Sequence, residues 1–588
     1  MKIITENPNI RFDQIELDNG YACYISGSGP LVYSTEQQDS SEYVAIENHS
    51  LYWCRPFWGS SLSVLPARTQ ALLIKNGKAY TYYLPICDSL YKTLIRGRQG
   101  GFEFYTYVNC NNVACEHQLA FICINGEDPL KVVKTAAREA CRLLDNGLKL
   151  RCEKDVPDVF DYLGWCSWDA LQIRVSHDGL MQKVREFKEK NAPVHFAIID
   201  DMWADVPALN DVAPGTSFGD MVRVMHASKL RSFEGDPKRF PKGMKAAIED
   251  MKKEGIQSVG VWFPTTGYWS GLEPGEDADT WQKDNTVTLA NGQVIVAPEK
   301  EKAQRYFDGL CAKVREWGGD FVKIDNQGFH QRYAGVYPIG SSARAIQNGI
   351  DAAADKHFNG ALINCMGMPS ECMFNRTSAV SRCSDDFMPE SREWFAKNIL
   401  QCSYNGLLQG QFYVNDWDMW WTDDEQAVKN SLCRAISGGP IYVSDKIGRT
   451  NPEVLKPLCL SDGRIIRADE SATPTADCLT ADPTKTERIF KIRNVIGDCG
   501  VCAVFNINAE NKTVSGTLLA SETGIADRDC VYYEYFTKES GVLKAGQSLD
   551  ITLNSNDDYR LYSFAPVSEY GDEYPGRTDL FMGVAVKK

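Results

Sequence analysis

The feature that most constrains this chain is a regular alternation of short, buried strands with helical segments, which begins near residue 158. The strand-like runs are Tyr162–Asp169, Val194–Asp201, Ser258–Phe263, Phe321–Asn326, Ala361–Met366, Ala379–Asp385, Gln411–Asp418 and Pro440–Asp445. Helical patterns lie between them, for example Asp178–Lys190, Pro241–Glu254, Lys300–Trp317, Ser342–His357, Ser391–Gly406 and Glu425–Ile436. Eight strand-helix alternations over roughly 290 residues predict a (β/α)8 TIM barrel, an α/β fold, in preference to a doubly wound sheet.

The two flanks of this segment have strand-and-turn character. Runs such as Leu51–Trp53 and Ala79–Leu84 predict an N-terminal β-sandwich domain over residues 1–150, with one helix from Asp128 to about Leu144. Runs such as Val501–Asn508 and Tyr559–Phe564 predict a small C-terminal β-sandwich domain over residues 456–588. The catalytic barrel is expected between them, over residues 155–455.

Composition excludes several classes of function. The formal net charge of −15 argues against a nucleic-acid or anionic-membrane partner, because phosphate groups are bound by clustered Lys and Arg. Only 7 His are present, and they are scattered, so we expect no metal centre. No dinucleotide-binding loop is apparent, so we expect no cofactor. No signal peptide or membrane span is apparent, which predicts a cytoplasmic protein; assembly into a homo-oligomer stays open.

Carboxylates follow most of the predicted barrel strands. They are Asp169, Asp200, Asp201, Asp325, Asp385, Asp386, Asp416, Asp418 and Asp445, several of them beside Trp. One Asp after a strand is usually a helix cap or a turn residue, but that explanation does not account for six strands of eight. The carboxyl ends of the strands meet at one rim of a TIM barrel. Carboxylates that bind hydroxyls and aromatic faces that cover C–H patches are what a sugar pocket needs.

Two strand ends have the residues for glycosidic chemistry, which uses one carboxylate as nucleophile or base and another as acid. Lys323 and Asp325 are two apart on a strand, so they share a face, and the ammonium favours an ionised Asp325. Arg382 precedes the adjacent pair Asp385 and Asp386, one of which can stay protonated as a general acid.

Six ordered motifs resemble one known family. They are Tyr162-Leu-Gly-Trp-Cys-Ser-Trp-Asp169, Ile198-Ile-Asp-Asp-Met-Trp203, Val322-Lys-Ile-Asp-Asn-Gln327, Arg382-Cys-Ser-Asp-Asp-Phe387, Asn415-Asp-Trp-Asp-Met419 and Ile441-Tyr-Val-Ser-Asp-Lys446. Together they resemble the raffinose synthase and seed-imbibition-protein branch of glycoside hydrolase family 36, which is related to the retaining α-galactosidases. The resemblance runs from about residue 158 to 470.

The resemblance implies roles for individual residues. It makes Asp325 the nucleophile and Asp386, four positions after Arg382, the acid/base, with Asp385 as the second choice. It implies that Asp200 and Asp201 bind the 4- and 6-hydroxyls of a galactosyl ring. The other implied substrate-binding residues are Trp168, Asp169, Trp262, Lys323, Asn364, Cys365, Arg382, Asp418 and Met419. Asn364 and Cys365 follow the fifth strand, near the 2-substituent, whose identity stays open.

The leading hypothesis is a retaining exo-α-galactosidase that hydrolyses small α-galactosides. The alternatives are an α-galactosyl transglycosidase of the raffinose-synthase type, a hydrolase for 2-amino or 2-acetamido galactosides, and a non-catalytic sugar-binding protein. In each case the partner is an oligosaccharide or glycoside. The insertion Leu272–Glu299 is either a lid or acceptor-site wall, or a surface excursion.

Overall fold

A computed structural model describes residues 2–36, 39–111, 113–213 and 215–586. Its centre is a parallel eight-stranded sheet with the order β23-β22-β21-β20-β17-β14-β13-β24, in which β23 and β24 close the ring incompletely. The strands are β13 (Leu163–Cys166), β14 (Phe196–Ile199), β17 (Ser258–Pro264), β20 (Phe321–Asp325), β21 (Leu362–Asn364), β22 (Val380–Arg382), β23 (Val414–Asp416) and β24 (Ile441–Val443). All eight predicted strands are present, and the predicted barrel is confirmed.

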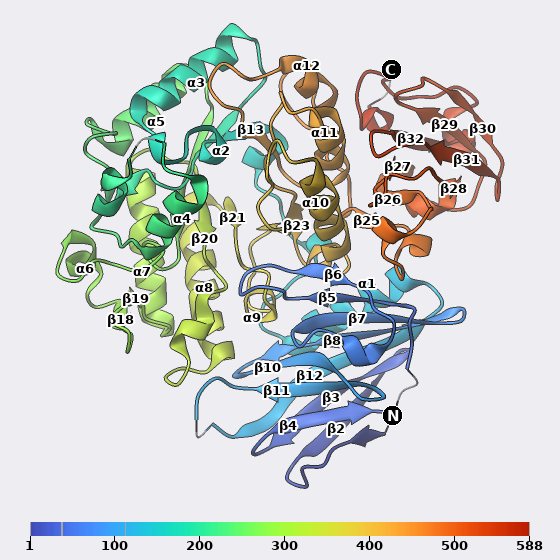
Figure 1. The fold of residues 1–588 in the computed structure, drawn as a ribbon, viewed down its shortest axis with the longest axis horizontal. Coiled ribbons are helices and arrows are strands. Elements are labelled where there is room, and N and C mark those ends of the chain that lie inside the picture. Colours follow the sequence, from blue (N-terminus) through green and yellow to red (C-terminus); the bar gives the residue numbers. More distant parts are fainter. Residues whose placement is uncertain (1, 37–38, 112, 214, 587–588) are drawn as a thin grey trace.

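Helices cover the outside of the barrel and follow the predicted pattern. They are α3 (His177–Glu189), α5 (Gly243–Lys253), α7 (Lys300–Glu316), α8 (Ile339–Phe358), α10 (Arg392–Asn405) and α11 (Ala427–Ile436). Figure 1 shows α7 and α8 on the side away from the C-terminal sheets, and α10 and α11 between the barrel strands and those sheets. Each helix therefore buries an apolar face against the strands, as the alternation requires.

Phenylalanines fill the end of the barrel opposite the strand carboxyl ends. The rings of Phe196 and Phe321 lie 5.6 Å apart, nearly perpendicular, and Phe160 packs against both. Gly164 and Gly260 make room for them, because a Cβ at either position would lie within 2.3 Å of a Phe ring. This close packing plugs one end, so only the rim at the carboxyl ends of the strands is open to a ligand.

The N-terminal part is a twelve-stranded antiparallel sheet. Its strands are β1 (Ile3–Ile4), β2 (Arg11–Leu17), β3 (Gly20–Gly27), β4 (Leu31–Thr35), β5 (Tyr43–Glu47), β6 (Arg55–Phe57), β7 (Thr69–Asn76), β8 (Ala79–Pro85), β9 (Cys87–Asp88), β10 (Tyr91–Arg98), β11 (Gly101–Tyr107) and β12 (Cys115–Gly126). Side chains alternate between two cores: Leu72 and Ile74 enter the domain's own core, whereas Ala71 and Leu73 join the large core shared with the barrel.

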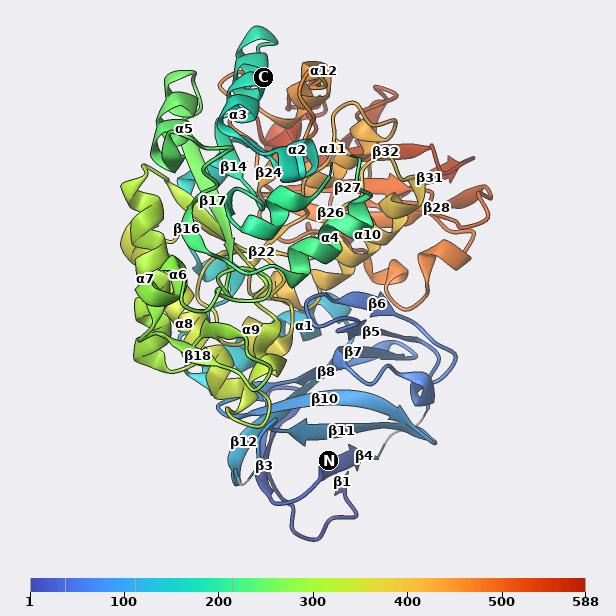
Figure 2. The same cartoon turned by 60° about the vertical axis from the view of Figure 1, so that its left-hand side comes forward.

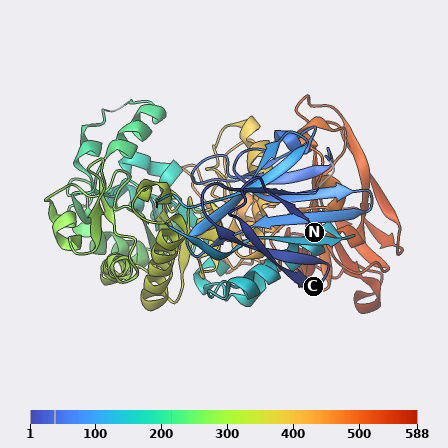
Figure 3. The ribbon, with the colours of Figure 1, turned by 90° about the horizontal axis from the view of Figure 1, so that it is seen from below.

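The chain leaves this sheet through α1 (Pro129–Leu144), which Asp128 caps through two backbone N–H groups. The C-terminal part has a six-stranded sheet, β25-β26-β27-β32-β29-β30, and a two-stranded sheet, β28-β31. Their bounds are β25 (Thr473–Pro474), β26 (Phe490–Ile496), β27 (Cys499–Phe505), β28 (Val514–Leu519), β29 (Cys530–Glu534), β30 (Ser540–Leu543), β31 (Ser548–Leu553) and β32 (Tyr559–Pro566). Figure 3 shows the N-terminal strands in front, with the barrel and the C-terminal sheets on either side. The exact domain limits at residues 150 and 455 stay predictions.

Candidate active site

A cavity of about 240 Å³ opens at the carboxyl ends of the barrel strands. Nine of the predicted site residues line it: Trp168, Asp200, Asp201, Trp262, Lys323, Asp325, Cys365, Asp386 and Met419. The other five, Asp169, Asn364, Arg382, Asp385 and Asp418, lie behind or beside its wall. The strand topology alone brings these carboxylates together, because parallel strands of a barrel end at one rim.

Asp325 ends β20 and is held in one orientation by two donors. Its Oδ2 accepts a hydrogen bond of 2.9 Å from Trp262 Nε1 on the neighbouring β17. Its Oδ1 accepts one of 2.7 Å from the backbone N–H of Asn326, which has a positive φ of 56°. Both oxygens therefore accept a hydrogen bond that fixes the orientation of the side chain, while the carboxylate still faces the cavity.

Lys323, two residues earlier, forms a buried ion pair with Asp200 at 2.7 Å. The same Asp200 oxygen accepts a hydrogen bond from the thiol of Cys166 on β13. Burial alone would lower the pKa of Lys323, but the Asp200 carboxylate overcomes this and raises it well above its ordinary value. The floor of the cavity thus carries a fixed positive and a fixed negative charge side by side.

Both carboxylate oxygens of Asp201 are bonded by aromatic residues of the cavity wall and its surroundings. Its two oxygens accept hydrogen bonds of 2.9 Å from the Tyr268 hydroxyl and 2.7 Å from Trp269 Nε1. Burial raises the pKa of Asp201 to about 7, with a smaller contribution from Asp200. Asp201 therefore positions Trp269, which itself lines the cavity.

Asp386 is the carboxyl that projects into the cavity from the end of β22, with a side chain 56% exposed. Desolvation within the site raises the pKa of Asp386 to about 6, and the charges of Asp418 and Asp325 act in the same direction. Arg382 opposes this shift through an ion pair of 3.2 Å. Arg382 is otherwise held by Asp418 at 2.9 Å and stands behind the wall, 1% exposed.

Asp385 points away from the cavity. Its Oδ2 lies 3.1 Å from His49 Nε2 of the N-terminal part and accepts a hydrogen bond of 3.2 Å from Gln401 on α10. Its backbone N–H also donates to Gln401 at 2.7 Å. Of the two candidates for acid/base, the geometry places Asp386 at the cavity and ties Asp385 to the domain contact.

Two other predicted substrate-binding residues, Asn364 and Asp169, do not line the cavity. Asn364 is fully buried, and its amide bonds Ser378, Val380 and Gln327, so it braces neighbouring strands; its contact with substrate stays a prediction. Burial raises the pKa of Asp169 well above its ordinary value, and the charges of Asp418 and Asp386 add to this.

Sequence reasoning missed seven lining residues. They are Trp53, Phe218, Val222, Met225, His226, Trp269 and Met366. Trp53 comes from the N-terminal part, in a turn held by Ser50 and Asn48, and its ring lies 5.3 Å from the Arg382 guanidinium. Nothing local in the sequence signals this long-range contact.

Four of the missed residues lie on α4 (Phe218–Ala227), between β14 and β17. Phe218, Val222 and Met225 have the i, i+4, i+7 spacing of one helix face, which was the available signal. The insertion Leu272–Glu299 instead carries α6 (Asp277–Gln282) and the hairpin of β18 (Thr286–Thr288) and β19 (Val294–Val296). None of its residues lines the cavity, so of its two interpretations the structure favours the surface excursion.

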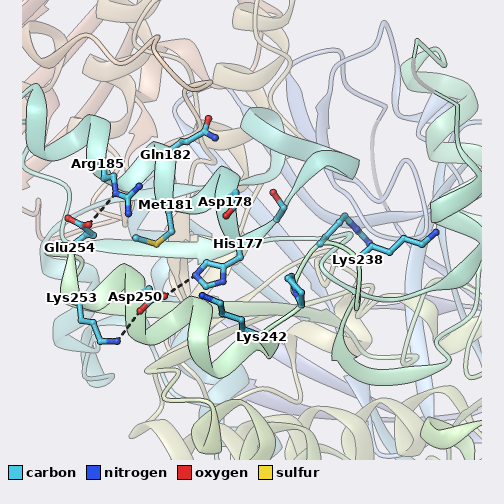
Figure 4. A pocket seen from close by; sticks show the side chains of 13 residues that line it. His177, Asp178, Met181, Gln182, Arg185, Lys238, Lys242, Asp250, Lys253 and Glu254 are labelled. Atoms are coloured by element: carbon cyan, nitrogen blue, oxygen red, sulfur yellow. Dashed lines mark hydrogen bonds and ion pairs between the residues drawn. The ribbon is translucent and has the colours of Figure 1, made fainter.

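A larger hollow of about 700 Å³ lies between α3 and α5 (Figure 4). Two of its carboxylates are engaged: Asp250 pairs with His177 at 3.2 Å and with Lys253 at 2.9 Å, and Glu254 pairs with Arg185. In the described part of the chain, no cluster of three or more His, Cys, Asp or Glu could hold a metal ion. Among the same residues, no helix is both long and apolar enough to cross a bilayer.

Comparisons with known proteins agree with this geometry. A family described as "Raffinose synthase or seed imbibition protein Sip1" matches residues 26–517. A probable galactinol–sucrose galactosyltransferase of Arabidopsis thaliana is 28% identical over 91% of this chain and 79% of its own. A stachyose synthase of Pisum sativum is 23% identical over 92% of this chain and 80% of its own.

Among solved structures, a glycoside hydrolase family 36 α-galactosidase variant from Geobacillus stearothermophilus, in complex with stachyose, matches with a TM-score of 0.61. The match covers 94% of this chain and 81% of that one, at 10% identity. It shows a shared fold.

Proposed function

The chain belongs to the raffinose synthase and seed imbibition protein family, and we propose that it is a retaining α-galactosyl transglycosidase. The observation that carries the proposal is one cavity lined by two carboxyls with different surroundings. Asp325 accepts hydrogen bonds at both oxygens, whereas desolvation within the site and the charges of Asp418 and Asp325 raise the pKa of Asp386 to about 6. Such a pair supplies a nucleophile and a general acid.

In the first displacement, a carboxylate oxygen of Asp325 forms a bond to the anomeric carbon of an α-galactoside. The bond from that carbon to the leaving oxygen breaks, and Asp386 gives its proton to that oxygen. The product is an ester between the galactosyl group and Asp325, with Asp386 left as a carboxylate. Trp262 and the Asn326 N–H hold the attacking carboxylate in place.

In the second displacement, the Asp386 carboxylate takes the proton of an acceptor hydroxyl. The acceptor oxygen bonds to the anomeric carbon, the ester to Asp325 breaks, and both carboxyls return to their starting states. Two displacements at one carbon retain its configuration. The acceptor decides the outcome, because a sugar gives transfer and water gives hydrolysis.

The names of the relatives favour transfer over hydrolysis, which was the leading hypothesis from the sequence. Curated relatives that match about nine-tenths of this chain include probable galactinol–sucrose galactosyltransferases and a stachyose synthase. We therefore propose galactinol as donor and sucrose as acceptor, with simple α-galactoside hydrolysis as the second candidate.

The test is to incubate the protein with galactinol, with and without sucrose, and to separate the products by chromatography. We expect an α-linked trisaccharide to be the main product at high sucrose. Free galactose released at the same rate with and without sucrose, and no trisaccharide, would establish the hydrolase instead.

The nucleophile can be tested separately with 5-fluoro-α-galactosyl fluoride, which slows the second displacement. We expect mass spectrometry of the digested protein to find the sugar on the peptide that contains Asp325. A label on another carboxyl would refute this assignment.

A further inference from the structure

Helix α4 lies over the cavity with one face turned inward. Figure 2 shows it in front of the barrel strands, below α2 (Trp168–Leu171). Phe218, Val222, Met225 and His226 all line the cavity. Positions i, i+4, i+7 and i+8 share one side of a helix, so the inner face of α4 is a wall of the site.

The N-terminal end of this wall is an aromatic pair, in which Phe218 is open to solvent and Trp168 is partly buried. The rings of Phe218 and Trp168 meet edge to face at 6.3 Å, and Phe218 is 43% exposed. The outer face of α4 is polar, with an exposed ion pair between Arg223 and Asp220. A large aromatic side chain left open at the mouth of a polar cavity fits the C–H face of a sugar ring.

The other end of the wall offers a polar group. The His226 ring packs against Trp269 at 4.7 Å. Burial lowers the pKa of His226; the charge of Asp325 opposes this shift and Arg332 adds to it, and the net lowering keeps the imidazole neutral at pH 7. Among the described residues its ring nitrogens have no hydrogen-bonding partner, so the ring is free to bond a hydroxyl.

We propose that the inner face of α4, together with Trp168, binds the acceptor sugar: Phe218 stacks on its C–H face and His226 bonds one of its hydroxyls. This inference rests on the proposed function. The strand-end carboxylates form the floor and hold the donor ring, and its anomeric substituent leaves on the Asp386 side. Trp168, at the α2 end of the wall, lines the same cavity as Asp386.

The test uses α-galactosyl fluoride as donor, because fluoride is too small to occupy the acceptor subsite. Fluoride release without sucrose reports the first displacement, and the ratio of trisaccharide to free galactose at increasing sucrose reports the acceptor. For Phe218→Ala we expect about a tenfold lower ratio of trisaccharide to free galactose, the loss of one stacking contact, and a smaller effect on fluoride release than on that ratio. Phe218→Tyr, which keeps the ring, should restore the ratio.

Arg223→Ala, on the outer face of the same helix, is the matched control and should leave the ratio unchanged. Ala is a stronger helix former than Phe, so the Phe218 variant keeps α4, and equal melting temperatures check this. Equal losses of fluoride release and of transfer would assign the wall to the donor sugar and overturn the inference. An unchanged ratio of trisaccharide to free galactose in the Phe218 variant would also overturn it. A wild-type protein that forms no trisaccharide would overturn the proposed function as well.

Discussion

At the scale of single residues, the pH dependence of the reaction follows from Asp386. A general acid must be protonated to act, and the pKa of Asp386 is raised to about 6. Below about pH 6 the carboxyl is mostly protonated, and its protonated fraction falls as the pH rises. We therefore expect kcat/KM for galactinol to fall as the pH rises through about 6, measured between pH 4.5 and 8. This fall in kcat/KM should be absent with α-galactosyl fluoride, because its leaving group needs no proton.

Asp385 is the matched control for this assignment. Asp386→Asn removes the acid and should lower kcat/KM for galactinol by about 10²- to 10⁴-fold. Asp385→Asn alters a carboxylate that bonds His49 and Gln401 outside the cavity, and should lower it by less than about tenfold. The reverse order of effects would make Asp385 the acid/base.

The buried pair of Lys323 and Asp200 gives a prediction about stability. Lys323→Met leaves the Asp200 carboxylate buried without its cation, which costs about 3–5 kcal/mol of folding free energy. We expect a clear fall in the melting temperature, followed by circular dichroism, and loss of activity. The double variant Lys323→Met/Asp200→Asn should melt higher than the single variant. If the single variant melts like wild type, the pair does not support the barrel as inferred.

At the scale of elements, the sequence predicted the barrel well because its strands are continuous apolar runs between helices. The end of each strand also told where its carboxylate would lie, since parallel strands share a rim. Side-chain direction after a strand end was not predictable in this way. Asp385 and Asp386 are adjacent, and only the packing of Gln401 on α10 and of His49 turns the first away from the cavity.

The loops were harder still, because their length does not tell where they fold. No residue of the charged insertion Leu272–Glu299 lines the cavity, whereas four residues of α4 do. Trp281 on α6 is 44% exposed and packs beside Phe233, so Trp281→Ser should leave the ratio of transfer to hydrolysis and kcat/KM within twofold of wild type. A loss of transfer without a loss of hydrolysis in this variant would show that the insertion forms part of the acceptor site.

At the scale of the whole molecule, the three parts share one core. A single cluster of buried apolar side chains joins Ile122 of the N-terminal sheet, Trp165 of the barrel and Phe505 of the C-terminal sheet. Hydrogen bonds such as those from Trp58 Nε1 to Leu479 and from Asn405 to Cys54 cross between them. Trp53 reaches the cavity through this contact, which explains why no local pattern revealed it. We therefore expect the flanking parts to unfold together with the barrel as one cooperative unit.

The ion pair of Lys92 and Glu371 tests this cooperativity. It joins β10 to α9 (Ser370–Met373), and both side chains are at most 3% exposed. Lys92→Met leaves Glu371 buried and unpaired, at a cost of about 3–5 kcal/mol. Because the parts share a core, we expect calorimetry to show one unfolding transition moved to lower temperature, with activity lost at that same temperature. Lys131→Met, at an exposed position of α1, should melt like wild type. A separate early transition that left the barrel active would show that the N-terminal sheet unfolds independently, and that Trp53 is dispensable for the site.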